Sequence, residues 1–345
     1  MRAFGLIAGI SGCDWSGYGY ISSMPALLSH RGLLVLLIAL APALHGGNAR
    51  ATKYAGEPYY LGVGGRALGR GGAFVASSPD ASSAFWNVAA LASLDRPEAM
   101  AQHAETFGSL LNHDFAAIVM PVSDSTGWAW GAYATYLGGG GIQLTALDTL
   151  THRPVVTRTE NHADWSLAFG LARKTPRWWS WGVTLKTVMR DLPGNFAYGL
   201  GLDAAWWGRG RGWGAGVKVA DITTTFLAWD SGRKETIVPH INWGGELDLP
   251  RVTEGLTTLF AAEAETYFEG RKTSAQYWAG SISVDLHLGF EAAYRNLLFA
   301  RVGSDAGRLA LGAGFASGRW AVDAAMTDHQ FLDNTYRVSL RYMIR

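Results

Sequence analysis

The feature that most constrains the fold is an alternation of apolar with small or polar residues, which recurs from residue 98 to the end of the chain. In the last such segment, one set of alternate positions holds Tyr336, Val338, Leu340, Tyr342 and Ile344, and the other holds Arg337, Ser339 and Arg341. A period of two residues belongs to a β-strand, whereas a helix would scatter both sets. Alternating segments of about ten residues are the sequence sign of a transmembrane β-barrel, with the apolar set facing lipid and the polar set facing the lumen.

Alternating segments of this kind can be counted along the chain. They fall near residues 98–106, 112–122, 127–138, 163–173, 179–190, 196–207, 212–220, 235–249, 256–268, 276–289, 297–304, 309–315, 320–327 and 336–344. The pattern therefore predicts an all-β fold, a transmembrane antiparallel barrel of about 14 strands over residues 98–345, and bacterial barrels have an even number of strands.

The composition fits a membrane barrel better than a water-soluble β-sandwich. The chain has 44 Gly and 15 Trp but only 17% charged residues. Many strands begin or end in tryptophan, where an interfacial aromatic girdle would lie: Trp128, Trp165, Trp181, Trp206, Trp207, Trp213, Trp243 and Trp278. A soluble sandwich would rarely leave so much tryptophan unburied. Lys plus Arg is 29 and Asp plus Glu is 28, so no basic field predicts a nucleic-acid partner.

The first part of the sequence carries an export signal. His30 and Arg31 precede the apolar run of residues 32–44, and the small-residue site Ala49-Arg50-Ala51 follows. The run is shorter than the ~20 residues that a membrane-spanning helix needs. We therefore expect residues 1–51 to be a signal peptide, with the mature chain starting at Thr52. After Thr52 no run of 18 consecutive apolar residues occurs, which excludes a helical membrane protein.

Two alternatives concern this signal. Residues 1–23 fit poorly before it, so Met24 is the more sensible start of the translated chain. A competing interpretation takes Ile10-Ser11-Gly12-Cys13 as a lipoprotein cleavage box, which would leave the better apolar segment in the mature protein. Cys13 is the single cysteine of the chain, so the expected mature protein has neither a disulfide nor a thiolate metal site.

The joins between strands predict an orientation. The longest gap in the alternation, residues 138–161, is expected to be an extracellular loop. Short joins at Ser123–Thr126, Lys174–Pro176 and Gly318–Arg319 are expected to be periplasmic turns.

Residues 52–97 lack the alternation and are rich in glycine, alanine and serine. A barrel this wide has a lumen too large for its own side chains to fill, so this segment is expected to be a plug. The runs GRALGRGGAFVA (65–76) and DASSAFWN (80–87) resemble the N-terminal signature of the FadL-like outer-membrane transporter superfamily, closer to its PorV/PorQ-like branch. Residues 296–342 resemble that branch's closing hairpins. Asn87-Val88-Ala89 departs from the family's usual Asn-Pro-Ala, and the chain ends in Ile344-Arg345 without a terminal aromatic residue.

The resemblance implies a hatch folded inside a fourteen-stranded barrel and passive transport of small hydrophobic molecules across the outer membrane. The alternative that it leaves open is a scaffold or shuttle in a protein secretion apparatus, as PorV-like members are understood to be. Expected partners are therefore membrane lipid, hydrophobic small molecules and, in the alternative, secretion-apparatus proteins. The plug residues expected to line a ligand path, or simply to pack, are Arg66, Phe74, Phe85, Trp86 and Asn87.

A second set of residues is expected to form a polar lumen that holds the plug by ion pairs. By alternation, Asp285 and His287 share a face and lie near Glu263 and Glu265 of the preceding strand. The other members are Lys186, Asp203, Lys218, Asp323, Arg337 and Arg341. An enzyme that uses Asp285 and His287 is the third and least favoured hypothesis, because every barrel of this class needs a polar lumen.

No cofactor or metal site is expected from the sequence. The glycine-rich run of residues 62–67 imitates a dinucleotide fingerprint, but no hydrophobic strand precedes it and no βαβ unit follows. The 9 histidines lack the spacing of helical metal ligands.

Overall fold

The computed structural model describes residues 50–51, 54–77, 79–122, 126–251, 253–329 and 332–345. The expected signal peptide, with Cys13, Met24 and Thr52, lies outside these residues apart from Arg50–Ala51. The strands are β1 (Arg50–Ala51), β2 (Glu98–Thr106), β3 (Leu111–Pro121), β4 (Trp128–Leu147), β5 (Pro154–Lys174), β6 (Trp179–Leu192), β7 (Asn195–Gly210), β8 (Trp213–Ala220), β9 (Thr225–Trp229), β10 (Lys234–Ile237), β11 (His240–Asp248), β12 (Leu256–Tyr267), β13 (Tyr277–Ala279), β14 (Ile282–Tyr294), β15 (Leu298–Asp305), β16 (Arg308–Ser317), β17 (Trp320–Thr327) and β18 (Thr335–Met343).

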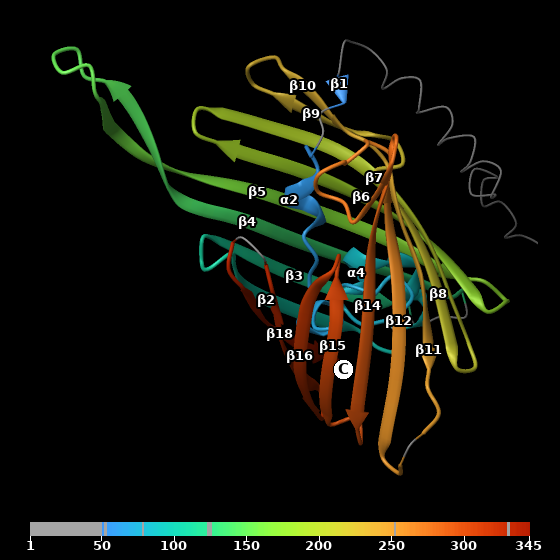
Figure 1. The fold of residues 1–345 in the computed structure, drawn as a ribbon. Helices are drawn as coiled ribbons and strands as arrows, with labels where there is room; N and C mark the ends of the chain where they lie inside the picture. Colours follow the sequence, from blue (N-terminus) through green and yellow to red (C-terminus); the bar gives the residue numbers. More distant parts are fainter. Residues whose placement is uncertain (1–49, 52–53, 78, 123–125, 252, 330–331) are drawn as a thin grey trace, which may run out of the picture. The chain divides into compact units, whose positions relative to one another are not determined.

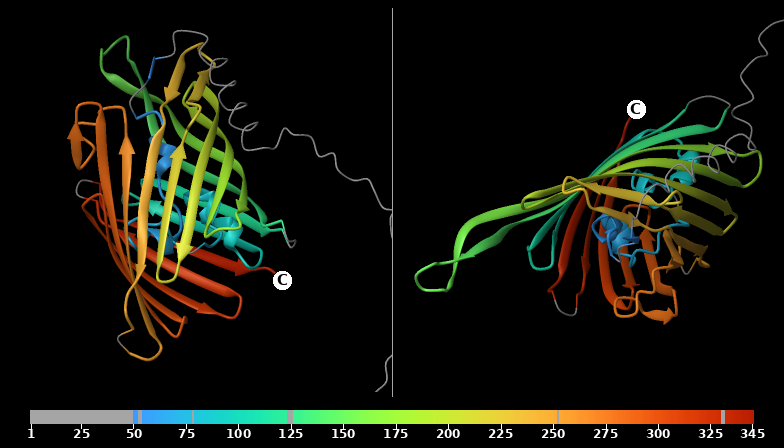
Figure 2. Two further views of the ribbon diagram at one scale, coloured as in Figure 1. Left: turned by 90° about the vertical axis from the view of Figure 1, so that its right-hand side faces the viewer. Right: turned by 90° about the horizontal axis from the view of Figure 1, so that it is seen from above.

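Among the described residues, 14 of these strands close a ring (Figures 1 and 2). The ring runs through β2 to β8, then β11, β12 and β14 to β18, and each neighbouring pair is antiparallel. It closes where β18 pairs with β2, for example Leu340 with Ala101. The predicted all-β barrel is confirmed, and closure leaves the ring without an open edge.

The strands alternate between the two faces of this wall as the sequence predicts. On β18, Leu340 is 43% exposed and Ser339 is 1% exposed. The outward-facing large residues of β16, β17 and β18 include Leu309, Leu311, Phe315, Trp320, Val322, Tyr336 and Val338, all exposed. Trp207 departs from the expected girdle: since its neighbour Trp206 points outward, Trp207 points inward and is buried. Among the helices in the described part of the chain, none has the length and apolar character to span a membrane.

Two predicted strands are each interrupted, and one hairpin was not predicted. Residues 235–249 form β10 and β11, separated by Pro239, which has no N–H for a sheet ladder. Residues 276–289 contain β13 and most of β14, separated by a turn at Gly280, whose φ is +64°. The unpredicted β9 pairs with β10 and with residues 197–200 of β7. The resulting β9–β10 hairpin stands between β8 and β11 in the chain.

The prediction that residues 138–161 form a loop is wrong. β4 and β5 continue through it as a two-stranded ribbon, and only residues 148–153 join them. The register shifts between Gly139 and Ile142, and Gly141 has a φ of +81°, so the glycine run bends the ribbon where it leaves the barrel. Figures 1 and 2 show the ribbon projecting beyond the wall. Because neighbouring strands are antiparallel, the predicted periplasmic joins at Lys174–Pro176 and Gly318–Arg319 lie at the opposite end, here named the turn end; the other is the ribbon end. Of the predicted join at Ser123–Thr126, only Thr126 lies within the described residues.

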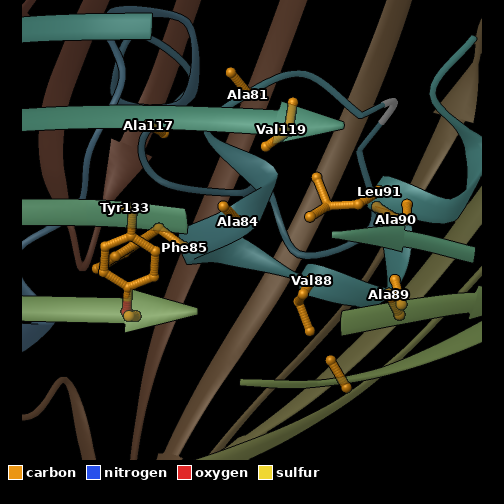
Figure 3. Close-up of a cluster of buried hydrophobic side chains, with 14 of the residues drawn as sticks. Ala81, Ala84, Phe85, Val88, Ala89, Ala90, Leu91, Ala117, Val119 and Tyr133 are labelled. Atoms are coloured by element: carbon orange, nitrogen blue, oxygen red, sulfur yellow. The ribbon is translucent and has the colours of Figure 1, made fainter. Parts of the chain in front are cut away.

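Residues 54–97, here named the inner segment, lie inside the barrel. They contain α2 (Glu57–Tyr60), α3 (Gly65–Leu68), α4 (Ser83–Trp86) and the 3₁₀ helix η2 (Val88–Ser93). α3 contacts β15 to β18, and η2 contacts β3 to β7 on the other side of the lumen. Figure 3 shows the apolar cluster that results, in which Phe85, Val88 and Leu91 pack against inward-facing Ala117, Val119 and Tyr133.

Inward-facing glycines of the wall let the inner segment approach the strands closely. A Cβ added at Gly216 of β8 would lie 2.0 Å from the carbonyl oxygen of Val75. A Cβ at Gly303 of β15 would lie 2.3 Å from the carbonyl carbon of Arg70. Part of the glycine excess in the sequence is therefore explained by backbone-to-backbone packing.

Candidate functional site in the barrel lumen

Ion pairs join the inner segment to the wall. The Arg70 guanidinium donates to the Glu246 carboxylate of β11 at 2.9 Å, and both side chains are fully buried. Arg66 lies 3.2 Å from Asp80 within the inner segment and 3.5 Å from Glu291 of β14. A charge that is removed from water needs an opposite charge close by, and Arg66 and Arg70 each have one.

Glu263 of β12 holds the inner segment by its backbone. Its Oε2 accepts hydrogen bonds from the backbone N–H groups of Phe74 and Val75, each at 2.8 Å, and its Oε1 accepts one from Asn242 at 3.1 Å. Two adjacent backbone donors that converge on one carboxylate form a charge-assisted contact. Phe74 therefore contributes its N–H as well as its buried ring.

Asn87 caps a helix and braces the inner segment at once. Its Oδ1 accepts from the Ala89 N–H and caps η2, while its Nδ2 donates to the carbonyl oxygens of Val75 at 2.8 Å and Trp206 of β7 at 3.0 Å. Val88, which stands where the family's usual Asn-Pro-Ala has proline, packs against the wall next to Asn87. Its side chain occupies the space that Cβ atoms at Gly170 and Gly182 would need, so these two wall glycines make room for it.

The aromatic residues of the inner segment pack mainly against one another and the wall. Phe85 makes edge contacts with Trp86, Phe115 and Tyr133, and Trp86 donates its indole N–H to the carbonyl oxygen of Val63 at 2.8 Å. Lys218 of β8 lies 5.0 Å above the Phe85 ring and donates to its carbonyl oxygen at 2.8 Å.

The predicted polar lumen residues fall into separate groups. Lys186 bridges Asp203 at 2.9 Å and Asp221 at 3.0 Å, and Lys218 lies 3.6 Å from Asp203. On the other side, strand pairing sets Glu263 opposite His287 and Glu265 opposite Asp285, so the four side chains expected near one another are neighbours on two adjacent strands.

The second group is tied to its neighbours. His287 lies 3.7 Å from Glu265, 3.1 Å from Asp305 and 3.0 Å from the carbonyl oxygen of Gly71. The Asp285 carboxylate accepts the Gln276 N–H at 2.7 Å. Within the described ranges, no three His, Cys, Asp or Glu side chains are grouped as metal ligands.

Several charged residues that join the inner segment to the wall, or join strands of the wall to one another, were not predicted. Arg70, Glu246 and Glu291 form the ion pairs described above, and Arg301 bridges Glu291 at 2.5 Å and Asp323 at 2.6 Å. Glu246 and Glu291 occupy inward positions by simple alternation, so the pattern could have found them. An arginine in a glycine-rich segment that is expected to lie inside the barrel could also have signalled that an acidic partner was needed.

A cavity of about 560 Å³ lies above helices α3 and α4 of the inner segment, at the ribbon end. Its floor and sides include Leu68, Phe85, Trp86 and Tyr133, and its upper wall includes Tyr60, His240, Tyr267, Arg271 and the loop residues Phe107, Ala306 and His329. Polar residues of both predicted groups line it as well: Lys186, Lys218, Glu263, Glu265, Asp285, His287 and Arg337. A volume of this size suits a small organic molecule.

A latch of aromatic and charged side chains closes one side of the cavity. Tyr60 makes an edge contact with His240 at 4.3 Å, and His240 stacks on Tyr267 at 5.0 Å. Arg271 lies 3.4 Å above the Tyr267 ring and pairs with Glu57 of α2 at 2.6 Å. Because Arg271 follows β12 and Glu57 is the first residue of α2, the latch joins the ribbon-end rim to the first helix of the inner segment.

The two arginines predicted on β18 differ in their surroundings. Arg341 lies 3.5 Å from Glu98, near the turn end. Arg337 lines the cavity and, among the described residues, has neither an ion pair nor a hydrogen-bond partner.

Comparison with known proteins shows a likeness of fold. No protein-family model and no curated protein sequence matches the chain. Among solved structures, the toluene transporter TbuX of Ralstonia pickettii superposes with a TM-score of 0.53 at 12% identity, over 82% of this chain and 99% of its own. The toluene transporter TodX of Pseudomonas putida gives 0.53 at 10% identity, over 81% and 96%. A FadL homologue of Pseudomonas aeruginosa gives 0.52 at 12% identity, over 81% and 98%.

Proposed function

We propose that this chain is a non-enzymatic outer-membrane channel for the passive transport of small hydrophobic molecules. The observation that carries the proposal is the combination of a closed wall that is apolar outside with a small-molecule cavity above a segment that fills the lumen. Two of the structures with the same fold are described as toluene transporters. The proposal places the ribbon end outside the cell and the turn end in the periplasm, since short turns are periplasmic in such barrels.

In this proposal the inner segment acts as a plug. A hydrophobic molecule enters the cavity from the ribbon end and meets Phe85 and Trp86 at its floor. It then passes when part of the inner segment shifts, without energy input. His287 and Asp285 serve to hold the plug and the rim, since His287 contacts Gly71 of the inner segment and Asp285 contacts the backbone of the 268–276 loop.

Uptake of a labelled small aromatic alcohol, benzyl alcohol, by cells with and without the chain tests the proposal. Ala220→Trp would fill the cavity that Ala220 lines, while Ala215→Trp on the same strand points away from the buried face and is the matched control. Both variants are first shown to fold by a heat-dependent shift in gel mobility. We expect faster uptake with the wild type and Ala215→Trp than with Ala220→Trp. Equal uptake by cells with and without a folded wild-type barrel would overturn the proposal.

A second candidate function, a scaffold or shuttle of the PorV type in a secretion apparatus, is favoured by the ribbon. Its side chains are exposed, including Leu147, Leu150, Val155 and Val156, and a two-stranded hairpin alone is marginally stable in water. A protein partner would give it a packing surface. Pull-down in mild detergent should then recover a partner with the full chain and lose it when a short turn replaces residues 142–160. A barrel that is repeatedly recovered alone would refute this candidate.

A further inference from the structure

Arg337 is a buried cation in the lumen without a counter-charge. It lies on β18 and points inward, its exposed fraction is 8%, and it lines the cavity. Its Nε atom is inaccessible and has no hydrogen-bond partner, and no carboxylate of a described residue lies within ion-pair distance of its guanidinium. A guanidinium carries five N–H donors and stays charged, so the described residues satisfy neither the hydrogen-bonding groups nor the charge of Arg337.

The other buried cations of the lumen show that this is an exception. Arg70 pairs with Glu246, Lys186 with Asp203 and Asp221, and Arg301 with Glu291 and Asp323. Asp305 is the acidic group that most affects Arg337, but its carboxylate is already held by Arg308 at 2.9 Å and His287 at 3.1 Å. Burial of an unpaired charge is costly, so a group from outside the chain is the natural partner.

The surroundings of Arg337 add a second donor and an apolar boundary. The Thr327 hydroxyl of β17 is buried, lines the same cavity and has no hydrogen-bond partner among the described residues. Phe107 also lines the cavity and is fixed by its N–H, which donates to the Thr335 hydroxyl at 3.3 Å. Elsewhere the cavity presents the rings of Phe85, Tyr133 and Tyr267.

We propose that the cavity binds small aromatic acids, with Arg337 and Thr327 receiving the carboxylate and the rings receiving the aromatic body. The planar fork of a guanidinium matches a carboxylate in bidentate geometry, and a desolvated cavity strengthens such a contact. The inference rests on the proposed transport function and narrows its substrates from small hydrophobic molecules in general to aromatic carboxylates.

Calorimetric titration of the purified full-length barrel in detergent tests this assignment. The probes are benzoate, benzyl alcohol and benzylamine, with inorganic phosphate as an anion that has no aromatic body. The variants are Arg337→Met and Arg337→Lys, and Arg341→Met is the matched control, since Arg341 lies on the same strand but pairs with Glu98. Arg337→Met removes an unpaired charge, so its unfolding temperature should be equal to or above that of the wild type.

We expect the wild type to bind benzoate about 10-fold or more tightly than benzyl alcohol, because a hydrogen bond to a charged group contributes at least that factor. Arg337→Met should lose this preference, Arg337→Lys should keep part of it, and Arg341→Met should keep all of it. Unchanged benzoate binding in Arg337→Met, a preference for benzylamine, or equal binding of phosphate would overturn the inference. Binding of benzyl alcohol alone would leave the transport function standing and refute this narrower one, whereas no binding of either aromatic probe would count against both.

Discussion

Arg70 of the inner segment and Glu246 of β11 form an ion pair of 2.9 Å in which neither side chain is exposed to solvent. The same Arg70 Nη2 also donates to the Ala73 carbonyl oxygen and to the Ser77 hydroxyl. One guanidinium nitrogen therefore joins a turn of the inner segment to the barrel wall. Arg66 reaches β14 and Arg70 reaches β11, and only β12 separates these two strands in the ring, so both arginines fix the inner segment to the same side of the wall.

Glu246→Gln should lower the free energy of unfolding by about 3 kcal/mol, because removal of one partner leaves a buried charge unmatched. Asp248→Asn, two residues away on the same strand, is the control, since Asp248 is 45% exposed and pairs with Arg209 near the surface. The expected cost there is under about 1 kcal/mol. Urea titration of the folded gel band measures both values. An equal fall in the free energy of unfolding in the two variants would show that the buried pair stabilises the barrel no more than the exposed one does.

Asn87→Asp should destabilise the inner segment by about 1–3 kcal/mol. The variant keeps an oxygen that can cap η2 but loses the two N–H donors to Val75 and Trp206. Limited proteolysis of the folded barrel should show faster cleavage within residues 54–97. If Asn87→Ala were cleaved quickly and Asn87→Asp as slowly as the wild type, the cap rather than the brace would be the important contact.

Gly216→Ala should loosen the packing of the inner segment and let hydrophilic molecules leak through. An added Cβ would lie 2.0 Å from the Val75 carbonyl oxygen, so the inner segment has to move. Gly245→Ala on the neighbouring strand is the control, because its Cβ would meet nothing closer than 3.6 Å. Dye uptake by cells that carry each variant measures the leak. Equal dye uptake in the two variants would argue against a lumen filled at β8.

Lowering the pH should weaken the contacts that the Asp80 carboxylate makes within the inner segment. Burial alone would raise the pKa of its carboxyl above the ordinary value of 3.8, but Arg341, Arg66 and hydrogen bonds from Ser82 outweigh burial and hold the pKa below it. The ionised form is therefore favoured by folding, so its contribution to stability is present above about pH 4 and is lost as the pH falls through the lowered pKa.

Asp80→Asn should lower the urea midpoint at neutral pH and should flatten its fall in acid. The measurement is the midpoint for wild type and variant at several values between neutral pH and about pH 3. A variant that follows the wild type throughout the acid range would show that other carboxylates set this dependence.

The sequence was sufficient to predict the strands of the barrel wall and some of the side chains that face the lumen. Alternation predicted all fourteen barrel strands and the shared face of Asp285 and His287, because a strand's period of two fixes which side chains face inward, whereas the pairing of Glu263 with His287 depends on the register. It could not separate β10 from β11 without weighing Pro239 as a break. It also took the ribbon for a loop, because the glycines near Gly139 hide a strand that continues past a bulge.

The contacts of the inner segment were much harder to predict. Its residues have no repeating period, so their partners depend on how the segment is threaded through the lumen. Arg66 and Asn87 were recognised by their place in a family-like motif, whereas the motif says nothing of the Arg70–Glu246 pair or of the unpartnered Arg337. Both depend on residues far apart in the chain that only the closed ring brings together.

Ion conductance of single barrels in a planar lipid bilayer tests the central claim most directly, that a membrane-spanning wall encloses a lumen filled by the inner segment. The wild-type chain should insert, as judged by its heat-dependent gel mobility after recovery from the membrane, and should show no steady conductance. A steady open conductance from the inserted wild-type chain would contradict the claim, because the lumen would then be a water-filled pore.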